Sequence, residues 1–180
     1  MENVFDYKTN NYKDKRTKLG NFFYSFIYKA SHFLMKHLWL YYLLNYTWGI
    51  IMTLVGWVVV FFSAVTLNKN ISKWGPSHYI VLGNNWGGLE LGTCFIVSDG
   101  MGDSWTLHTK CHEMGHSFQN AILGPFMIFL VSIPSATRYW VQIINRKLKH
   151  PERNKDYDCF WAEESATDVG TRYYEEFTKK

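Results

Sequence analysis

The 180-residue sequence is poor in cysteine, and the spacing of its cysteines argues against two common kinds of framework. Three are present, Cys94, Cys111 and Cys159, and no two of them form a C-x-x-C pair. An odd number without metal-type spacing argues against a disulfide framework and is typical of a reducing compartment. We therefore expect all three to behave as small hydrophobic residues.

Other familiar patterns are also missing. The net charge is +4, but the basic residues are not interleaved with aromatics as in RNA-binding modules, so we expect anionic lipid as a partner and no nucleic acid. No cleavable signal peptide is expected, because the first 18 residues are polar and basic and the apolar stretch begins late and runs long. The chain contains no internal repeat or low-complexity segment.

Residues 38–67 lack any charged side chain. A helix of that length would be about 45 Å long, whereas a bilayer core is about 30 Å thick, so we predict a membrane-embedded segment. It is either one tilted span or a re-entrant hairpin that bends near Gly49 or Gly56. The 8 Trp, 12 Tyr and 13 Phe of the chain suit a protein seated at a membrane interface.

The segment before this apolar run divides into two parts. Residues 1–18 are polar and basic without an apolar period, which predicts a flexible basic tail. Residues 19–36 carry apolar side chains at helical spacing, which predicts an amphipathic helix on the membrane interface. Residues 19–67 are thus expected to form interfacial and membrane-embedded helices.

Two β-like runs flank a segment dense in turn formers. Residues 79–82 and 89–97 are rich in strand formers, and residues 83–88 contain three glycines and two asparagines. We predict a hairpin between the two runs. Its strand near residues 89–97 offers an edge along which an extended peptide can align by main-chain hydrogen bonds.

The sequence His112-Glu113-Met114-Gly115-His116 reads H-E-x-x-H. Apolar residues at spacings of three and four predict a helix over 107–123 that ends at Gly124-Pro125. Residues i and i+4 share a helix face, so His112 and His116 can bind one Zn²⁺ ion. Glu113 would lie beside the metal, where it can take a proton from a zinc-activated water as the catalytic residue.

A catalytic zinc usually has three protein ligands, so a third is expected elsewhere. A final helix is predicted over 158–177, and it carries Glu164 and Asp168 on one face. We assign Glu164 as the third metal ligand and Asp168 as the acceptor of a spare histidine ring N–H. Glu163 lies about 100° round the helix from Glu164 and is the alternative ligand.

H-E-x-x-H followed by E-x-x-x-D resembles the gluzincin metallopeptidases of the thermolysin type. The resemblance implies zinc held by His112, His116 and Glu164, with Glu113 as general base and Asp168 behind the ligands. The pattern is also similar to a group of small bacterial membrane-associated peptidases, which share Gln119, L-G-P at 123–125 and I-P-S at 133–135. This likeness covers about residues 80–175, and it implies a zincin-like metal-binding domain over 68–180.

Residues 126–144 form a second apolar segment, broken by Pro134. If it crossed the bilayer, the last helix would begin on the far side from the histidines, so we expect it to be membrane-embedded and to return, with the bend at Pro134. Basic residues both before residue 37 and after residue 145 predict that both ends lie in the cytoplasm. The expected location is the inner, cytoplasmic membrane, with the active site facing the cytoplasm.

The predicted fold is therefore mainly α with a small β-hairpin or sheet (α+β): a minimal zincin-like core plus membrane-embedded or re-entrant helices. The predicted function is that of a membrane-associated zinc metallopeptidase whose partners are the lipid bilayer and a peptide or protein substrate. The alternatives are a non-catalytic membrane protein with a structural zinc site, and a membrane scaffold without metal. Candidates for an oxyanion donor are His108, His150, Tyr157 and Tyr173.

Overall fold

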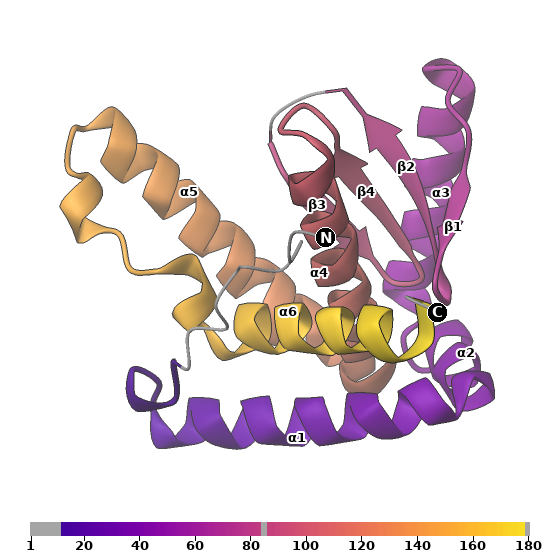
Figure 1. Ribbon diagram of the computed structural model, residues 1–180, viewed down its shortest axis with the longest axis horizontal. Coiled ribbons are helices and arrows are strands. Elements are labelled where there is room, and N and C mark those ends of the chain that lie inside the picture. Colours follow the sequence, from indigo (N-terminus) through magenta and orange to yellow (C-terminus); the bar gives the residue numbers. More distant parts are fainter. Residues whose placement is uncertain (1–11, 84–85, 179–180) are drawn as a thin grey trace.

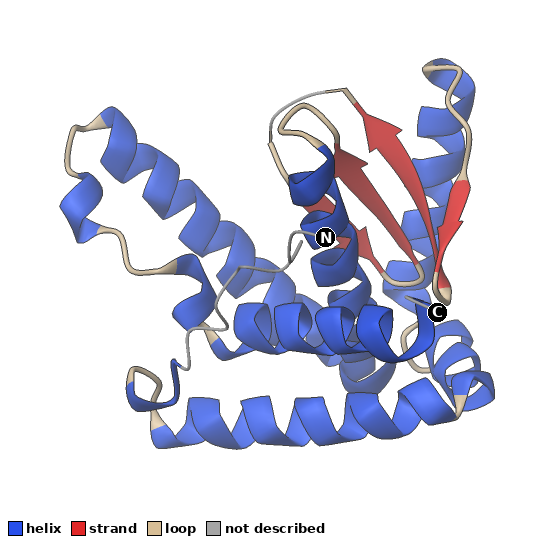
Figure 2. Cartoon of the chain, viewed as in Figure 1, coloured by secondary structure: helices blue, strands red, loops and turns tan. Residues whose placement is uncertain are grey.

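The computed structural model describes residues 12–83 and 86–178, which form a mainly helical α+β fold (Figures 1 and 2). This confirms the mainly α, α+β part of the predicted fold class. The main helices are α1 Lys18–Lys36, α2 Leu38–Tyr46, α3 Ile50–Thr66, α4 Asp103–Leu123, α5 Ile133–Lys147 and α6 Trp161–Tyr173. The strands are β1 Ser72–Trp74, β2 Ser77–Leu82, β3 Gly88–Leu91 and β4 Cys94–Ser98.

The sheet has the strand order β1-β2-β4-β3, and its pairing differs from the predicted hairpin. Strand β2 runs parallel to β4, whereas β3 and β4 form the antiparallel hairpin. The predicted strand over 89–97 is therefore two strands. They separate at Gly92, whose φ of +72° is left-handed and favours a turn after Leu91. The split leaves β3 at an edge of the sheet.

Helices α3 and α4 cover opposite faces of the sheet. Along β4, the side chains of Cys94 and Ile96 pack with Val60 of α3. The alternate side chains Phe95 and Val97 pack with the α4 helix in the main core. This alternation is the period of two that a strand imposes when both faces are buried.

Helices α4 and α6 touch backbone to backbone. A Cβ atom added at Gly115 of α4 would lie 1.9 Å from the Ala166 carbonyl oxygen. One added at Gly170 of α6 would lie 1.7 Å from the Cys111 carbonyl oxygen. Two glycines thus bring the helices close enough for side chains of α6 to reach the histidines of α4. Helix α1 runs along the other side of α6 (Figure 1).

The apolar run over 38–67 is bent by 87° between α2 and α3. The break lies at residues 47–49, where the sequence allows a bend near Gly49. A second bend of 113° separates the α4 unit, which extends to Phe126, from the helical segment that starts at Ile128. The predicted bend at Pro134 is therefore wrong. Pro134 lies near the start of α5, directly after the π-helical turn Ile128–Ser132, and the two form one helical segment.

Among the described residues, each helix taken alone is too short or too polar to be a candidate membrane span. The two bent pairs reach the required length and apolarity only when their members are counted together.

The outer face of α3 exposes a continuous set of large apolar side chains. They are Ile51, Leu54, Val55, Val58, Phe61, Phe62 and Val65. Helix α5 projects from the body, and none of its residues is buried (Figure 1). Its exposed apolar residues include Ile133, Trp140, Val141 and Ile144.

The end of the predicted basic tail is packed against the body. Tyr12 is buried, and the Arg16 side chain forms an ion pair with Glu164 of α6. The prediction of a flexible tail over 1–18 is therefore wrong for residues 12–17; residues 1–11 lie outside the described part of the chain.

Candidate metal centre

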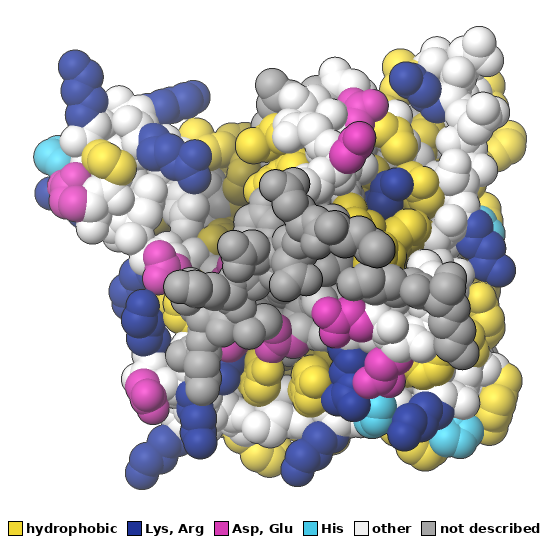
Figure 3. Space-filling model, viewed as in Figure 1, with side chains coloured by type: hydrophobic (Ala, Val, Ile, Leu, Met, Phe, Trp, Pro, Cys, Tyr) yellow, Lys and Arg dark blue, Asp and Glu magenta, His cyan; other side chains and the backbone are white. Residues whose placement is uncertain are grey.

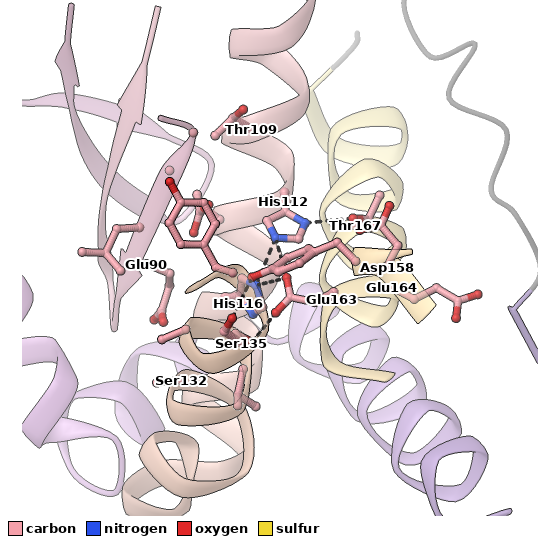
Figure 4. A pocket seen from close by; sticks show the side chains of 18 of the residues that line it. Glu90, Thr109, His112, His116, Ser132, Ser135, Asp158, Glu163, Glu164 and Thr167 are labelled. Carbon is pink, nitrogen blue, oxygen red and sulfur yellow. Dashed lines mark hydrogen bonds and ion pairs between the residues drawn. The ribbon is translucent and has the colours of Figure 1, made fainter. Parts of the chain in front are cut away.

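His112 and His116 occupy successive turns of α4 and direct their rings to one point (Figure 4). Their Nε2 atoms lie 3.1 Å apart. The Oε2 atom of Glu163 lies 3.1 Å from Nε2 of His112 and 3.4 Å from Nε2 of His116. The three residues offer ligand atoms within 4.8 Å of one another, so this group could hold a metal ion. His116 and Glu163 are buried, and His112 is half-buried.

The acid that meets the histidines is Glu163, not the predicted ligand Glu164. Helix α6 turns by about 100° per residue, so adjacent acids point to different surroundings. The Glu164 carboxylate points away from the histidines (Figure 4), pairs with the Arg16 guanidinium and accepts the Tyr12 backbone N–H at 3.3 Å. Glu164 therefore anchors the N-terminal segment, and the alternative assignment, Glu163, fits the geometry.

The predicted partner of a histidine ring, Asp168, is also directed elsewhere. Its carboxylate accepts a hydrogen bond from the Tyr24 hydroxyl of α1. The Nδ1 atom of His112 instead lies 2.8 Å from Oγ1 of Thr167, the residue one turn after Glu163. The two residues of α6 that meet the histidines are thus Glu163 and Thr167, which are four positions apart. The E-x-x-x-D pattern of Glu164 and Asp168 did not indicate this pair.

Gln119 fixes the tautomer of His116. Its side-chain N–H₂ donates to the Ala162 carbonyl at 2.7 Å and to Ser165 Oγ at 2.9 Å. Because that carbonyl can only accept, the amide oxygen must face His116, where it accepts from Nδ1 at 2.8 Å. Nδ1 therefore carries a hydrogen, and the neutral ring has its lone pair on Nε2, directed at His112 and Glu163. Partners of this kind orient metal-binding histidines.

The acids and the histidines at this point shift one another's pKa. Burial disfavours a charged His116 ring, but the carboxylates of Glu163, Glu113 and Glu90 together outweigh burial and raise the pKa of His116 to about 10. Burial would raise the pKa of Glu163, yet the two histidines hold it well below its ordinary value. Without a metal, a proton on His116 Nε2 balances Glu163. Two imidazoles and a carboxylate also form a donor set that zinc accepts in catalytic sites, so the residues fit a metal ion.

Ser135 holds the second oxygen of the candidate ligand. Its hydroxyl donates to Oε1 of Glu163 from the start of α5. With Oε1 engaged, Oε2 is left for the histidines. Ser135 belongs to the I-P-S pattern in the sequence, which gave no indication of this contact.

Glu113 is buried next to the edge strand. Its carboxylate accepts the backbone N–H of Glu90, and burial raises its pKa above the ordinary value. A Cβ atom added at Gly88 would lie 2.4 Å from Oε1 of Glu113, so only glycine leaves this space free. The carboxylate is thus confined between α4 and β3, where a proton acceptor with a raised pKa can act as a general base.

The group formed by His112, His116 and Glu163 opens into a cavity of about 1000 Å³. One wall is β3 with Trp86 before it, the floor is α4, and the opposite wall is formed by the start of α5 and by α6. His108 and Tyr157 line the cavity. His150 instead bonds to Glu152 at the surface, and Tyr173 is buried in the core. The structure therefore leaves two of the four candidate oxyanion donors near the site.

No family model, curated protein or solved structure matches the chain.

Proposed function

We propose that the protein is a membrane-associated zinc metallopeptidase. The observation that carries the proposal is the convergence of His112, His116 and Glu163 on one point, with Glu113 confined beside it in a large cavity. A purely structural zinc site needs neither a cavity nor a buried carboxylate next to the ligands. Zinc is the favoured metal because its catalytic sites combine histidines with one carboxylate and leave a position open.

His112, His116 and Glu163 would hold the ion, which would polarise the scissile carbonyl and lower the pKa of the attacking water to about 7. Glu113 takes the proton of the attacking water and passes it to the leaving amine. The backbone N–H of Glu90 orients the Glu113 carboxylate toward this task. Gln119 and Thr167 hold the two imidazole rings in place.

The edge strand β3 would bind the substrate backbone. All four of its residues line the cavity, and on its cavity side it pairs with no strand within the described part of the chain. An extended peptide can add to such an edge by main-chain hydrogen bonds. Gly88 brings the bound backbone close to Glu113 because no side chain stands between them.

Tyr157 is the candidate for stabilising the developing oxyanion. Tyr157 lines the cavity, and its hydroxyl donates to the Ser135 carbonyl at 3.4 Å. Burial, followed by the charges of Glu163 and Glu113, raises its pKa. A phenol that stays protonated is a hydrogen-bond donor at any physiological pH. By contrast, burial lowers the pKa of His108 to about 4, so its ring is neutral at pH 7.

Membrane association is supported by the exposed apolar faces of α3 and α5 and by the basic surface beyond α5. Lys and Arg side chains gather at the far end of α5 (Figure 3). The Lys15 ammonium lies 3.3 Å from Asp156, so the segments before α1 and after α5 meet on one side of the molecule. We infer that α2–α3 and α5 enter the bilayer and return, which keeps the site at the cytoplasmic surface.

The test is the Glu113→Gln variant, assayed with a mixture of peptides by mass spectrometry. The variant should bind zinc as the wild type does, because Glu113 is not a ligand, and it should lose peptide hydrolysis by about 10²–10⁴-fold. Hydrolysis retained by the zinc-loaded variant would remove Glu113 from the mechanism. Absence of hydrolysis by the zinc-loaded wild type would refute the peptidase proposal.

A further inference from the structure

The cavity is acidic although the chain carries a net positive charge. Among the described residues that line it there are six carboxylates and no Lys or Arg. The six are Glu90, Glu113, Asp158, Glu163, Glu164 and Asp168. Such an arrangement is costly, because buried carboxylates need cations or hydrogen-bond donors to replace water.

Among the described residues, two of these carboxylates form ion pairs with cationic side chains. Glu163 faces the two histidines, and Glu164 pairs with Arg16. Asp168 accepts from a tyrosine hydroxyl, and Glu113 accepts from a backbone N–H. Glu90 and Glu113 lie near the histidines, and neither forms an ion pair within the described part of the chain.

Glu90 is the carboxylate most in need of a cation. It is 6 % exposed, and its Oε1 atom accepts from the Gly92 backbone N–H. Within the described part of the chain, its Oε2 atom has no hydrogen bond or ion pair. Burial raises the pKa of Glu90 to about 8, and the nearby Glu113 carboxylate raises it further. A cation in the cavity would favour the charged form again.

Glu90 also lies where a substrate backbone would run. It is the third residue of β3 and follows Gly88, which touches Glu113. Two residues along a strand span about 7 Å, so a peptide aligned on β3 with its scissile bond near Glu113 reaches Glu90 within one or two residues. The main-chain group of a peptide that carries a positive charge is its free N-terminal ammonium. This group can therefore lie near Glu90 when the scissile bond lies near Glu113.

We propose that the cavity selects peptides by an ammonium group, and that the Glu90 carboxylate binds the free α-amino group of the substrate. This rests on the proposed peptidase function and specifies its substrate class. The substrate is a peptide with a free N-terminus, from which the enzyme removes one or two residues at a time. A lysine side chain also carries an ammonium group. The experiment below distinguishes a lysine ammonium from the α-amino group of the substrate.

The test measures binding apart from catalysis. Zinc-loaded Glu113→Gln protein is titrated with three fluorescent peptides. The first has a free N-terminus, the second is the same sequence with an acetylated N-terminus, and the third is the acetylated peptide with its first residue replaced by lysine. The free peptide should bind about 10- to 100-fold more tightly than either acetylated one, the range expected for a charge-assisted hydrogen bond. Equal affinities would overturn the proposal, and tightest binding of the acetylated lysine peptide would overturn the assignment to the α-amino group.

Two matched variants locate the charge. Glu90→Gln keeps the acceptor for the Gly92 N–H, so folding and zinc content should persist while the preference for the free N-terminus disappears. Asp158→Asn removes another carboxylate of the same cavity and should leave the preference unchanged. The reverse pattern would refute the role of Glu90. Because the readout is binding, this result stands apart from whether the wild type hydrolyses peptides.

Discussion

Two adjacent acids, Glu163 and Glu164, give a matched pair of substitutions with opposite expected effects. Glu163 faces the histidines, whereas Glu164 faces Arg16. We predict that Glu163→Gln loses tight zinc binding, and that Glu164→Gln keeps zinc binding but destabilises the fold. Both variants keep the size and shape of the side chain and change one charge.

The size of the zinc effect follows from the number of ligands. Zinc binds small protein sites with about 10–16 kcal/mol, shared among four ligands, or about 2.5–4 kcal/mol for each. Loss of the Glu163 carboxylate should therefore weaken zinc binding by about 10²–10³-fold. In the metal-free protein the same change also removes the counter-charge of His116, so its ring is expected to become neutral.

The size of the stability effect follows from burial. The Arg16 and Glu164 side chains are 5 % and 10 % exposed. Breaking a buried ion pair by removing one partner costs about 3–5 kcal/mol, because the other charge remains buried. The free energy of unfolding of a folded domain is about 5–15 kcal/mol, so this loss is a large part of it. Zinc affinity should stay close to that of the wild type.

The assay is a zinc titration against a chromophoric chelator, combined with denaturant unfolding in the presence of EDTA. The first measures affinity and the second measures the metal-free fold. Zinc loss in Glu164→Gln with normal binding in Glu163→Gln would refute the geometry of the site. Equal zinc loss in both variants would also contradict it, because it would mean that the two acids do not face different surroundings.

Four further predictions concern space and protons. Gly88→Ala places a Cβ 2.4 Å from the Glu113 carboxylate, which must move by about 1 Å, so kcat should fall about 100-fold with zinc content unchanged. Gly115→Ala meets the Ala166 carbonyl at 1.9 Å, which forces α4 and α6 apart, so thermal unfolding should shift to a markedly lower temperature and zinc should be lost. In the metal-free protein the pKa of His116 is raised from 6.5 to about 10, so zinc displaces about one proton and its affinity, measured by chelator competition, should rise about tenfold per pH unit between pH 6.5 and 8. The same raised pKa means that the His116–Glu163 pair stabilises the metal-free fold fully below pH 6.5 and that this contribution is lost as the pH rises through about 10, which denaturant unfolding against pH would detect.

The local parts of the site could be predicted from the sequence. A spacing of four places His112 and His116 on one helix face whatever the rest of the chain does. The Gly124-Pro125 pair ends α4 because Gly124 adopts a left-handed φ of +54° that other residues avoid. The amphipathic helix over 19–36 and the break near Gly49 are likewise local features of the pattern.

The choice between Glu163 and Glu164 could not be predicted, because it depends on how α6 is rotated against α4. That rotation is set by the backbone contacts at Gly115 and Gly170, which are tertiary. Glu164 and Asp168 do share a face, as the spacing indicates, but this face meets α1 and the segment before it rather than the histidines.

The pairing of the strands could not be predicted from the sequence either. Residues 79–82 and 89–97 look like the arms of one hairpin, yet β2 and β4 run parallel and the hairpin forms within the second run. Periodicity identifies strands but not their neighbours, and a turn at Gly92 is short enough to be read as part of a strand. The result matters for function because it places β3 at the edge beside Glu113.

The most direct test of the metal centre is the zinc anomalous signal in crystals of the zinc-loaded protein. We predict one zinc ion bound by His112, His116 and Glu163, with a fourth position open to the cavity next to Glu113. A zinc ion whose fourth position is occupied by another protein ligand would contradict the proposed catalytic role and favour a structural one. Zinc bound elsewhere, with these three side chains unoccupied, would contradict the site itself.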